Sequence, residues 1–259
     1  MNNFREKERG IKMKRMFAFV LALMMALAMT ACSRDGTVHT DGDAGKNPQT
    51  TKGTAETEKN AEPTELPTVV SQETQADTAF MGNLVDGTYT NSFFGFRCEL
   101  GESWTYASNE QLGSLVGITA EVVNDEDLAQ AMLDSGVVYD MYASTQEGLV
   151  TASLAVENMG LVYGSLINED TYVSISIGQL PAALESMGLT NVTAEAGTVE
   201  FAGQEHAAVL VHGVLNGVDF YETMVCIKVD RYMGVVTVSC YYEDITENVL
   251  SLFQAYQSK

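Results

Sequence analysis

A histidine and a cysteine in the C-terminal half of the chain are the residues whose types and spacing could support nucleophilic chemistry. From Val192 onward the sequence predicts a four-stranded antiparallel meander, and its two-residue turns pair His212 with Tyr221 and Tyr221 with Cys240. A thiol beside an imidazole can form an activated thiolate. The predicted row lies on an apolar face, however, and no third residue that would orient the imidazole is identified. We therefore expect a core histidine and assign no catalytic residue.

The remaining cysteines indicate structural thiols. The chain has four cysteines, and Cys32 is assigned below to lipid attachment. That leaves Cys98, Cys226 and Cys240, an odd number for an oxidising compartment. The predicted register sets Cys226 and Cys240 on opposite faces of the sheet and out of line along it, which disulfide geometry does not allow. We expect three buried free thiols.

Sequence motifs of common enzyme and metal sites are absent: there is no G-x-S-x-G, H-E-x-x-H, C-x-x-C, Walker A or G-x-G-x-x-G pattern. The acidic run 124–127 lacks the glycine and final glutamate of an EF-hand loop and is simpler to interpret as the charged first turn of a helix. His39 precedes the folded part, and His206 is expected to be exposed at a strand start, so no zinc site is predicted. We expect no metal and no cofactor.

The charge of the chain excludes some partners. The chain has 14 Lys+Arg against 35 Asp+Glu, a net charge of -21. Because phosphate neutralisation needs clustered Lys and Arg, nucleic-acid binding is excluded, and adsorption to anionic lipid headgroups is disfavoured. Residues 1–31 are nevertheless basic, whereas residues 80–259 hold only four bases and 24 acids. A basic start before an acidic body directs attention to the N-terminus.

The N-terminus has the pattern of a secretory signal. Residues 16–31 carry no charge and follow Lys14 and Arg15 directly. Residues 27–32, LAMTAC, resemble the lipobox of bacterial lipoproteins, although Met29 stands where that pattern usually has Leu. The resemblance implies a signal peptide over 1–31 and a diacylated Cys32 as the new N-terminus. An uncleaved anchor helix is the alternative, and both place the body outside the cytoplasm.

Residues 32–79 are expected to be a disordered tether behind the lipidated cysteine. Residues 33–79 contain no aromatic residue but hold three of the four prolines of the chain, so they cannot bury enough apolar area to offset chain entropy. A flexible coil of this length reaches about 40 Å. One globular domain is expected over 80–259, which is long enough to bury a core without disulfides.

Strands and helices alternate in the predicted domain. Pro181 is expected to kink or break the longest helix, and a sheet that is apolar on both sides needs cover on both. The predicted fold class is α+β, a mainly antiparallel sheet with helices on both faces. The expected elements are hairpins at 87–91 with 94–100 and at 137–144 with 149–157, helices at 108–116, 125–133, 168–187 and 245–256, and the meander from 192.

This layout, together with Tyr89, residues 93–96 (FFGF) and Trp104, resembles the PsbP-like α/β/α sandwich over roughly residues 87–257. The family usually has a proline shortly before the tryptophan, whereas residues 100–103 here are LGES. The resemblance implies an accessory or binding module without shared catalytic residues. We expect a lipid-anchored protein of the cell envelope that binds an envelope protein or a small ligand without catalysis. A hydrolase with paired carboxylates is the alternative, and a module for divalent cations is a third possibility.

Overall fold

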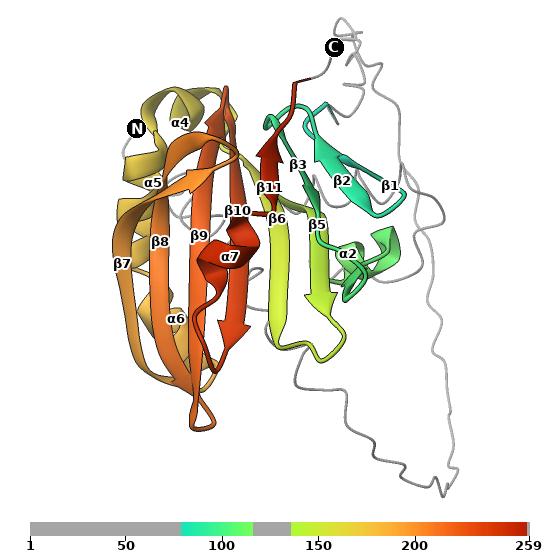
Figure 1. The fold of residues 1–259 in the computed structure, drawn as a ribbon. Helices are drawn as coiled ribbons and strands as arrows, with labels where there is room; N and C mark the ends of the chain where they lie inside the picture. Colours follow the sequence, from blue (N-terminus) through green and yellow to red (C-terminus); the bar gives the residue numbers. More distant parts are fainter. Residues whose placement is uncertain (1–78, 116–135, 258–259) are drawn as a thin grey trace, which may run out of the picture. The chain divides into compact units, whose positions relative to one another are not determined.

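A seven-stranded antiparallel sheet forms the centre of the folded part (Figure 1). The computed structural model describes residues 79–115 and 136–257. The strand order is β4-β5-β6-β10-β9-β8-β7, and each neighbouring pair is antiparallel. The predicted α+β class with a mainly antiparallel sheet is therefore confirmed. The strands are β4 (Trp104–Tyr106), β5 (Val137–Thr145), β6 (Val150–Asn158), β7 (Leu189–Phe201), β8 (Gln204–Leu215), β9 (Val218–Val229) and β10 (Tyr232–Tyr241).

The predicted meander is confirmed as β7 to β10, joined by two-residue turns. At the middle turn Asn216 has a φ of 53° and Gly217 a φ of 83°. A type I′ turn needs positive φ at both central residues, and Asn-Gly adopts these angles at low cost. The turn chemistry therefore fixes the register of β8 on β9 locally.

A second, four-stranded sheet joins the two ends of the described chain. Its order is β1-β2-β3-β11, with strands β1 (Asn83–Val85), β2 (Thr88–Asn91), β3 (Phe96–Glu99) and β11 (Phe253–Ala255). β2 and β3 form the predicted first hairpin. The predicted terminal helix over 245–256 is wrong, because only α7 (Thr246–Leu250) is helical and β11 then pairs antiparallel with β3.

The reason for this difference is tertiary. The ring of Phe253 packs 5.7 Å from the ring of Phe96 and 5.1 Å from that of Phe201, measured between centroids. The apolar spacing of residues 245–256 suits a helix, but Phe253 is buried where β11 pairs with β3, a tertiary contact that overrides the local pattern.

The two faces of the large sheet are covered differently. We call the side carrying Glu157, Glu222 and Cys226 the helix face, because α5 (Glu169–Ile177) and α6 (Leu180–Ser186) pack there on β7, β8 and β9. We call the other side, carrying Thr223 and Gly234, the small-sheet face. It meets the small sheet and α7. Figure 1 shows α7 in front of β9 and β10, with α5 and α6 behind the large sheet.

α2 and the break between α5 and α6 follow their predicted signals. α2 (Asn109–Leu115) begins with the predicted capping box, in which Ser108 Oγ accepts from Gln111 N at 3.3 Å and Gln111 Oε1 accepts from Ser108 N at 2.8 Å. The predicted break at Pro181 is confirmed, because Pro181 lies in the first turn of α6, where its missing N–H costs nothing. The predicted helix at 125–133 lies outside the described residues. Over residues 79–115 and 136–257, no helix is long and apolar enough to cross a membrane.

Candidate functional site

The row predicted from register is present, but its histidine is not a core residue. His212 pairs with Tyr221, and Tyr221 pairs with Cys240. The His212 and Tyr221 rings lie 4.9 Å apart, and His212 Nε2 lies 3.3 Å from Asp219 Oδ1. The His212 side chain is 42% exposed, which corrects the expectation of a core histidine. The register alone could have found Asp219, because it is the diagonal neighbour of His212 on the same face.

This row does not form a thiolate–imidazole pair. His212 and Cys240 lie on strands two apart in the sheet, which separates them by about 10 Å. Burial raises the pKa of the Cys240 thiol, although backbone hydrogen bonds from Ile245 and Thr246 oppose that effect. A thiol that stays protonated, beyond reach of the imidazole, is a structural group.

The other two described thiols are equally protected. Cys98, Cys226 and Cys240 are all free and buried, as predicted. Cys98 Sγ lies 3.8 Å from the Tyr106 hydroxyl, and burial raises the pKa of this thiol to about 11. Burial also raises the pKa of Cys226. Cys226 pairs with Val235, five positions from Cys240 on the same strand, so the register rules out a bridge between the two cysteines.

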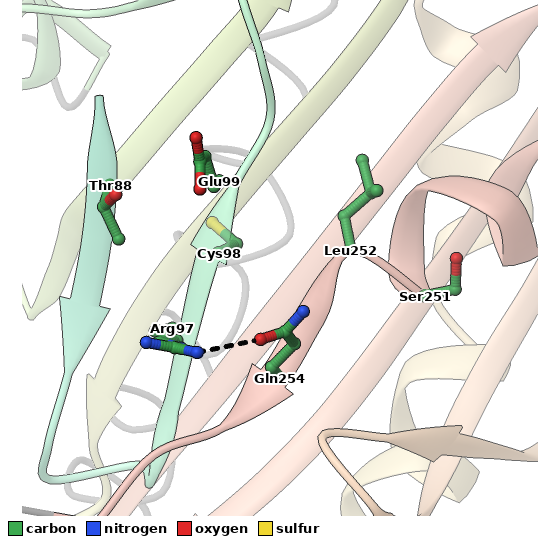
Figure 2. Close-up of a pocket in the computed structure, with 7 residues that line it drawn as sticks. All are labelled: Thr88, Arg97, Cys98, Glu99, Ser251, Leu252 and Gln254. Atoms are coloured by element: carbon green, nitrogen blue, oxygen red, sulfur yellow. Dashed lines mark hydrogen bonds between the residues drawn. The ribbon is translucent and has the colours of Figure 1, made fainter. Parts of the chain in front are cut away.

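A hollow of about 240 Å³ lies on the outer side of the small sheet, where β2, β3 and β11 meet the end of α7 (Figure 2). Arg97 Nη2 donates to Gln254 Oε1 at 3.1 Å across the β3–β11 pair. Because Arg97 is exposed and Glu99 lines the same hollow, the surface can offer both charges to a small polar ligand. Its lining residues are Thr88, Arg97, Cys98, Glu99, Ser251, Leu252 and Gln254.

A buried carboxylate connects the small sheet to the large one. Asp140 lies at a β-bulge of β5, where the register on β6 shifts. Its Oδ2 accepts from Gly82 N at 2.8 Å, from Asn91 Nδ2 at 2.8 Å and from the Tyr89 hydroxyl. Burial raises the pKa of Asp140, and these three donors oppose that rise. Sequence reasoning did not identify this site, since a bulge cannot be read from strand periodicity.

Two further carboxylates are buried on the helix face. Tyr172 of α5 donates from its hydroxyl to Glu157 Oε2 at 3.1 Å, and Ser239 Oγ donates to Glu222 Oε2 at 2.7 Å. Burial raises the pKa of each carboxyl to about 7, and the single hydrogen bond each accepts opposes that effect only in part. Glu157 pairs with Met233 of β10, and Glu222 pairs with Ser239 of β10. Met233 and Ser239 are six positions apart along β10, which separates the two carboxylates by about 20 Å.

Glu169, the first residue of α5, binds two strands where they diverge. β8 pairs with β9 from Ala208 onward but not before it. Across that divergence Glu169 accepts from Lys228 N at 2.9 Å and from Ala207 N at 3.4 Å, and it lies 3.0 Å from His206 Nδ1. Burial alone would raise the pKa of Glu169, but these interactions hold it below its ordinary value. The His206 side chain is only 13% exposed, which corrects the expectation of an exposed strand start.

One helix exposes apolar side chains and was not predicted from the sequence. α4 (Gly160–Leu166) leaves Leu161 79%, Val162 63% and Leu166 71% exposed. We call these three residues the α4 surface. No periodic signal marks this helix in the sequence, because an apolar run without polar alternation shows no amphipathic stripe.

The chain matches no protein-family model and no curated protein. Within the two described segments, no group of three or more His, Cys, Asp or Glu side chains is placed to hold a metal ion. Cys32 and the acidic run 124–127 lie outside the described residues.

Proposed function

We propose that the chain is a membrane-anchored lipoprotein of the bacterial cell envelope whose domain, residues 80–259, acts outside the cytoplasm as a non-catalytic binding module. The observation that carries this proposal is the sequence of residues 27–32, LAMTAC, directly after a basic and then an apolar run. In this proposal Cys32 carries the lipid and residues 33–79 are the tether. Two acyl chains hold a protein stably at a bilayer.

The chemistry of the described residues supports binding more than catalysis. All three thiols are buried with a raised pKa, which is unfavourable for a nucleophile. Paired carboxylates in hydrolases lie about 5–10 Å apart. Glu157 and Glu222 are about 20 Å apart, and Asp140 faces the small sheet on the other side of the large sheet. These buried carboxylates give the hydrolase alternative no support.

We infer a PsbP-like sandwich as the finer fold. The order of layers supports it, with α5 and α6 on the helix face of a central antiparallel sheet. The other face departs from the expectation of helices on both sides, because a small sheet covers it together with the short α7. What the family resemblance implies, an accessory or binding role, agrees with a domain whose outer hollow presents Arg97 and Glu99.

Lipidation is tested by replacing Cys32 with Ala in the full chain. We expect the variant to lose the acyl mass in mass spectrometry and to leave the membrane fraction, because no thiol remains to be acylated at that position. Ser33→Ala is the matched control and keeps both properties. Retention of Cys32→Ala in the membrane would instead favour an uncleaved anchor helix.

The binding role is tested with the full lipidated chain. We expect capture from detergent-solubilised envelopes to enrich a partner that persists over a range of salt concentrations, and a basic partner to weaken as salt rises. Failure to enrich any protein, combined with no thermal stabilisation by envelope extracts of small molecules, contradicts the binding module.

A further inference from the structure

α4 is oriented opposite to an ordinary surface helix. A surface helix normally turns its apolar stripe toward the core. In α4 the buried residue is Gly164, whereas the three residues of the α4 surface face solvent. The side chain of the adjacent Tyr163 is 36% exposed. Exposed aliphatic residues gathered on one helix mark a contact surface more often than scattered ones do.

The orientation is fixed by a close backbone contact. A Cβ on Gly164 would lie 2.7 Å from Arg231 Cα, so only glycine lets α4 rest on the β9–β10 turn. The chain just before α4 is bound to the same turn, because Met159 N donates to Arg231 O at 2.9 Å. Figure 1 shows α4 at the end of the sheet where β9 ends and β10 begins. The α4 surface is therefore held outward on a rigid support.

The charges around α4 differ from those of the acidic domain. No charged residue lies between Glu157 and Glu169. Of the three bases among the described residues, two, Lys228 and Arg231, lie at the turn on which α4 rests, with Asp230 between them. Charges more than about 8 Å away are screened at physiological salt. This end of the domain can therefore approach an anionic surface that would repel the acidic remainder of the domain.

We propose that the α4 surface docks onto the phospholipid bilayer that anchors the chain, inserting Leu161, Val162 and Leu166 at the boundary between headgroups and acyl chains. This inference rests on the proposed function, since the anchor brings the bilayer within reach. For a flexible tether of the length of residues 33–79, the root-mean-square end-to-end distance is about 40 Å. At such an effective concentration a weak contact is sufficient, and a helix with Lys and Arg beside exposed aliphatic residues suits an interface.

A bilayer fits this surface better than a second copy of the chain does. A seven-residue helix is about 10 Å long, and its exposed side offers far less than the roughly 800 Å² per partner of a stable protein interface. Insertion into lipid needs no complementary partner surface, so a few aliphatic side chains are enough.

The test uses the chain from Ser33 onward, which lacks the leader and Cys32 but contains every described residue, mixed with phosphatidylcholine vesicles with and without one-third phosphatidylglycerol. We expect measurable cosedimentation that the double substitution Leu161→Ser with Leu166→Ser lowers at least about tenfold, because two inserted side chains are lost. The matched control is Leu84→Ser with Val85→Ser, a pair in β1 that is also exposed and is predicted to leave binding unchanged.

Several outcomes overturn the inference: no vesicle binding by the parent chain, equal losses in both double variants, or a dimer in sedimentation equilibrium that depends on Leu161 and Leu166. Circular dichroism checks that each variant keeps its fold, which we expect because all four side chains are exposed. If the chain does not bind vesicles but Cys32→Ala leaves the membrane fraction, only the docking role of α4 is contradicted. Retention of Cys32→Ala in the membrane that persists when Leu161 and Leu166 are also replaced by Ser, together with vesicle binding, removes only the lipid anchor.

Discussion

At the scale of single residues, buried polar groups in this domain are used to hold parts together. Asp140 illustrates this, because three donors from the N-terminal segment converge on one of its oxygens. A carboxylate in an apolar core is costly unless it is hydrogen-bonded. Two of those donors, Tyr89 and Asn91, belong to β2 and the third, Gly82, directly precedes β1, so the hydrogen bonds also hold the small sheet in place.

Tyr89→Phe tests this connection. Removing the hydroxyl leaves Asp140 with one donor fewer in a buried position, so we expect the free energy of unfolding to fall by about 1–3 kcal/mol. Urea denaturation followed by circular dichroism measures it. Tyr242→Phe is the control, because that ring is 65% exposed and is expected to change stability by less than about 0.5 kcal/mol. Equal stability of the two variants contradicts the role given to Tyr89.

The residues of the site show what a sequence can and cannot predict. The row of His212, Tyr221 and Cys240 follows from turns of fixed length, and the register of the structure confirms it. The exposure of His212 does not follow, because it depends on how far the small sheet and α7 extend over β8, and those segments are distant in the sequence. The same holds for Asp140, whose donors lie about 50 residues earlier.

At the scale of elements, the predicted helix ends and turns are correct where a single residue type determines the backbone conformation. Pro181 breaks the α5–α6 helix, and Asn216 with Gly217 sets a hairpin. The prediction of a helix over 245–256 is wrong because Gln254 pairs with Arg97, a partner 157 residues away that no local pattern reveals. α4 was not predicted for the opposite reason, since its apolar residues face solvent and carry no stripe toward the core.

Glu169 tests how α5 is attached to the sheet. Glu169→Ala removes the acceptor of two strand amides at the divergence of β8 and β9, so we expect a loss of about 1–3 kcal/mol in the free energy of unfolding. Asp170→Asn is the control, because its exposed side chain lies in the same first turn of α5. Amide hydrogen exchange at Ala207 and Lys228 should rise in Glu169→Ala alone. Unchanged exchange at both amides contradicts the attachment.

At the scale of the whole molecule, two carboxyl groups buried far apart on the helix face give the fold a common dependence on pH. The pKa of Glu157 and of Glu222 is about 7 in the folded state, against about 4.3 in an unfolded chain. Between these values the folded state binds more protons than the unfolded state. The contribution of these two groups to the free energy of unfolding is therefore fully present below about pH 4. It falls as the pH rises and is lost above about pH 7.

The expected size of this effect makes it measurable. A difference of between two and three pKa units corresponds to about 3 kcal/mol for each group, so the free energy of unfolding should be several kcal/mol lower at pH 8 than at pH 5.

Glu169 acts in the opposite direction, because its pKa is lowered, but its contribution is lost only below about pH 4.5. Glu157→Gln with Glu222→Gln should reduce the slope of the curve between pH 5 and pH 8, since an amide keeps an acceptor for Tyr172 and Ser239 without titrating. Asp140, whose pKa burial also raises, remains in this variant and acts in the same direction as the two glutamates. Glu195→Gln, an exposed glutamate of β7, should leave the curve unchanged. Urea denaturation at each pH measures the slope, and a stability that rises from pH 5 to pH 8 in the parent chain would mean that both carboxyls are ionised in the fold.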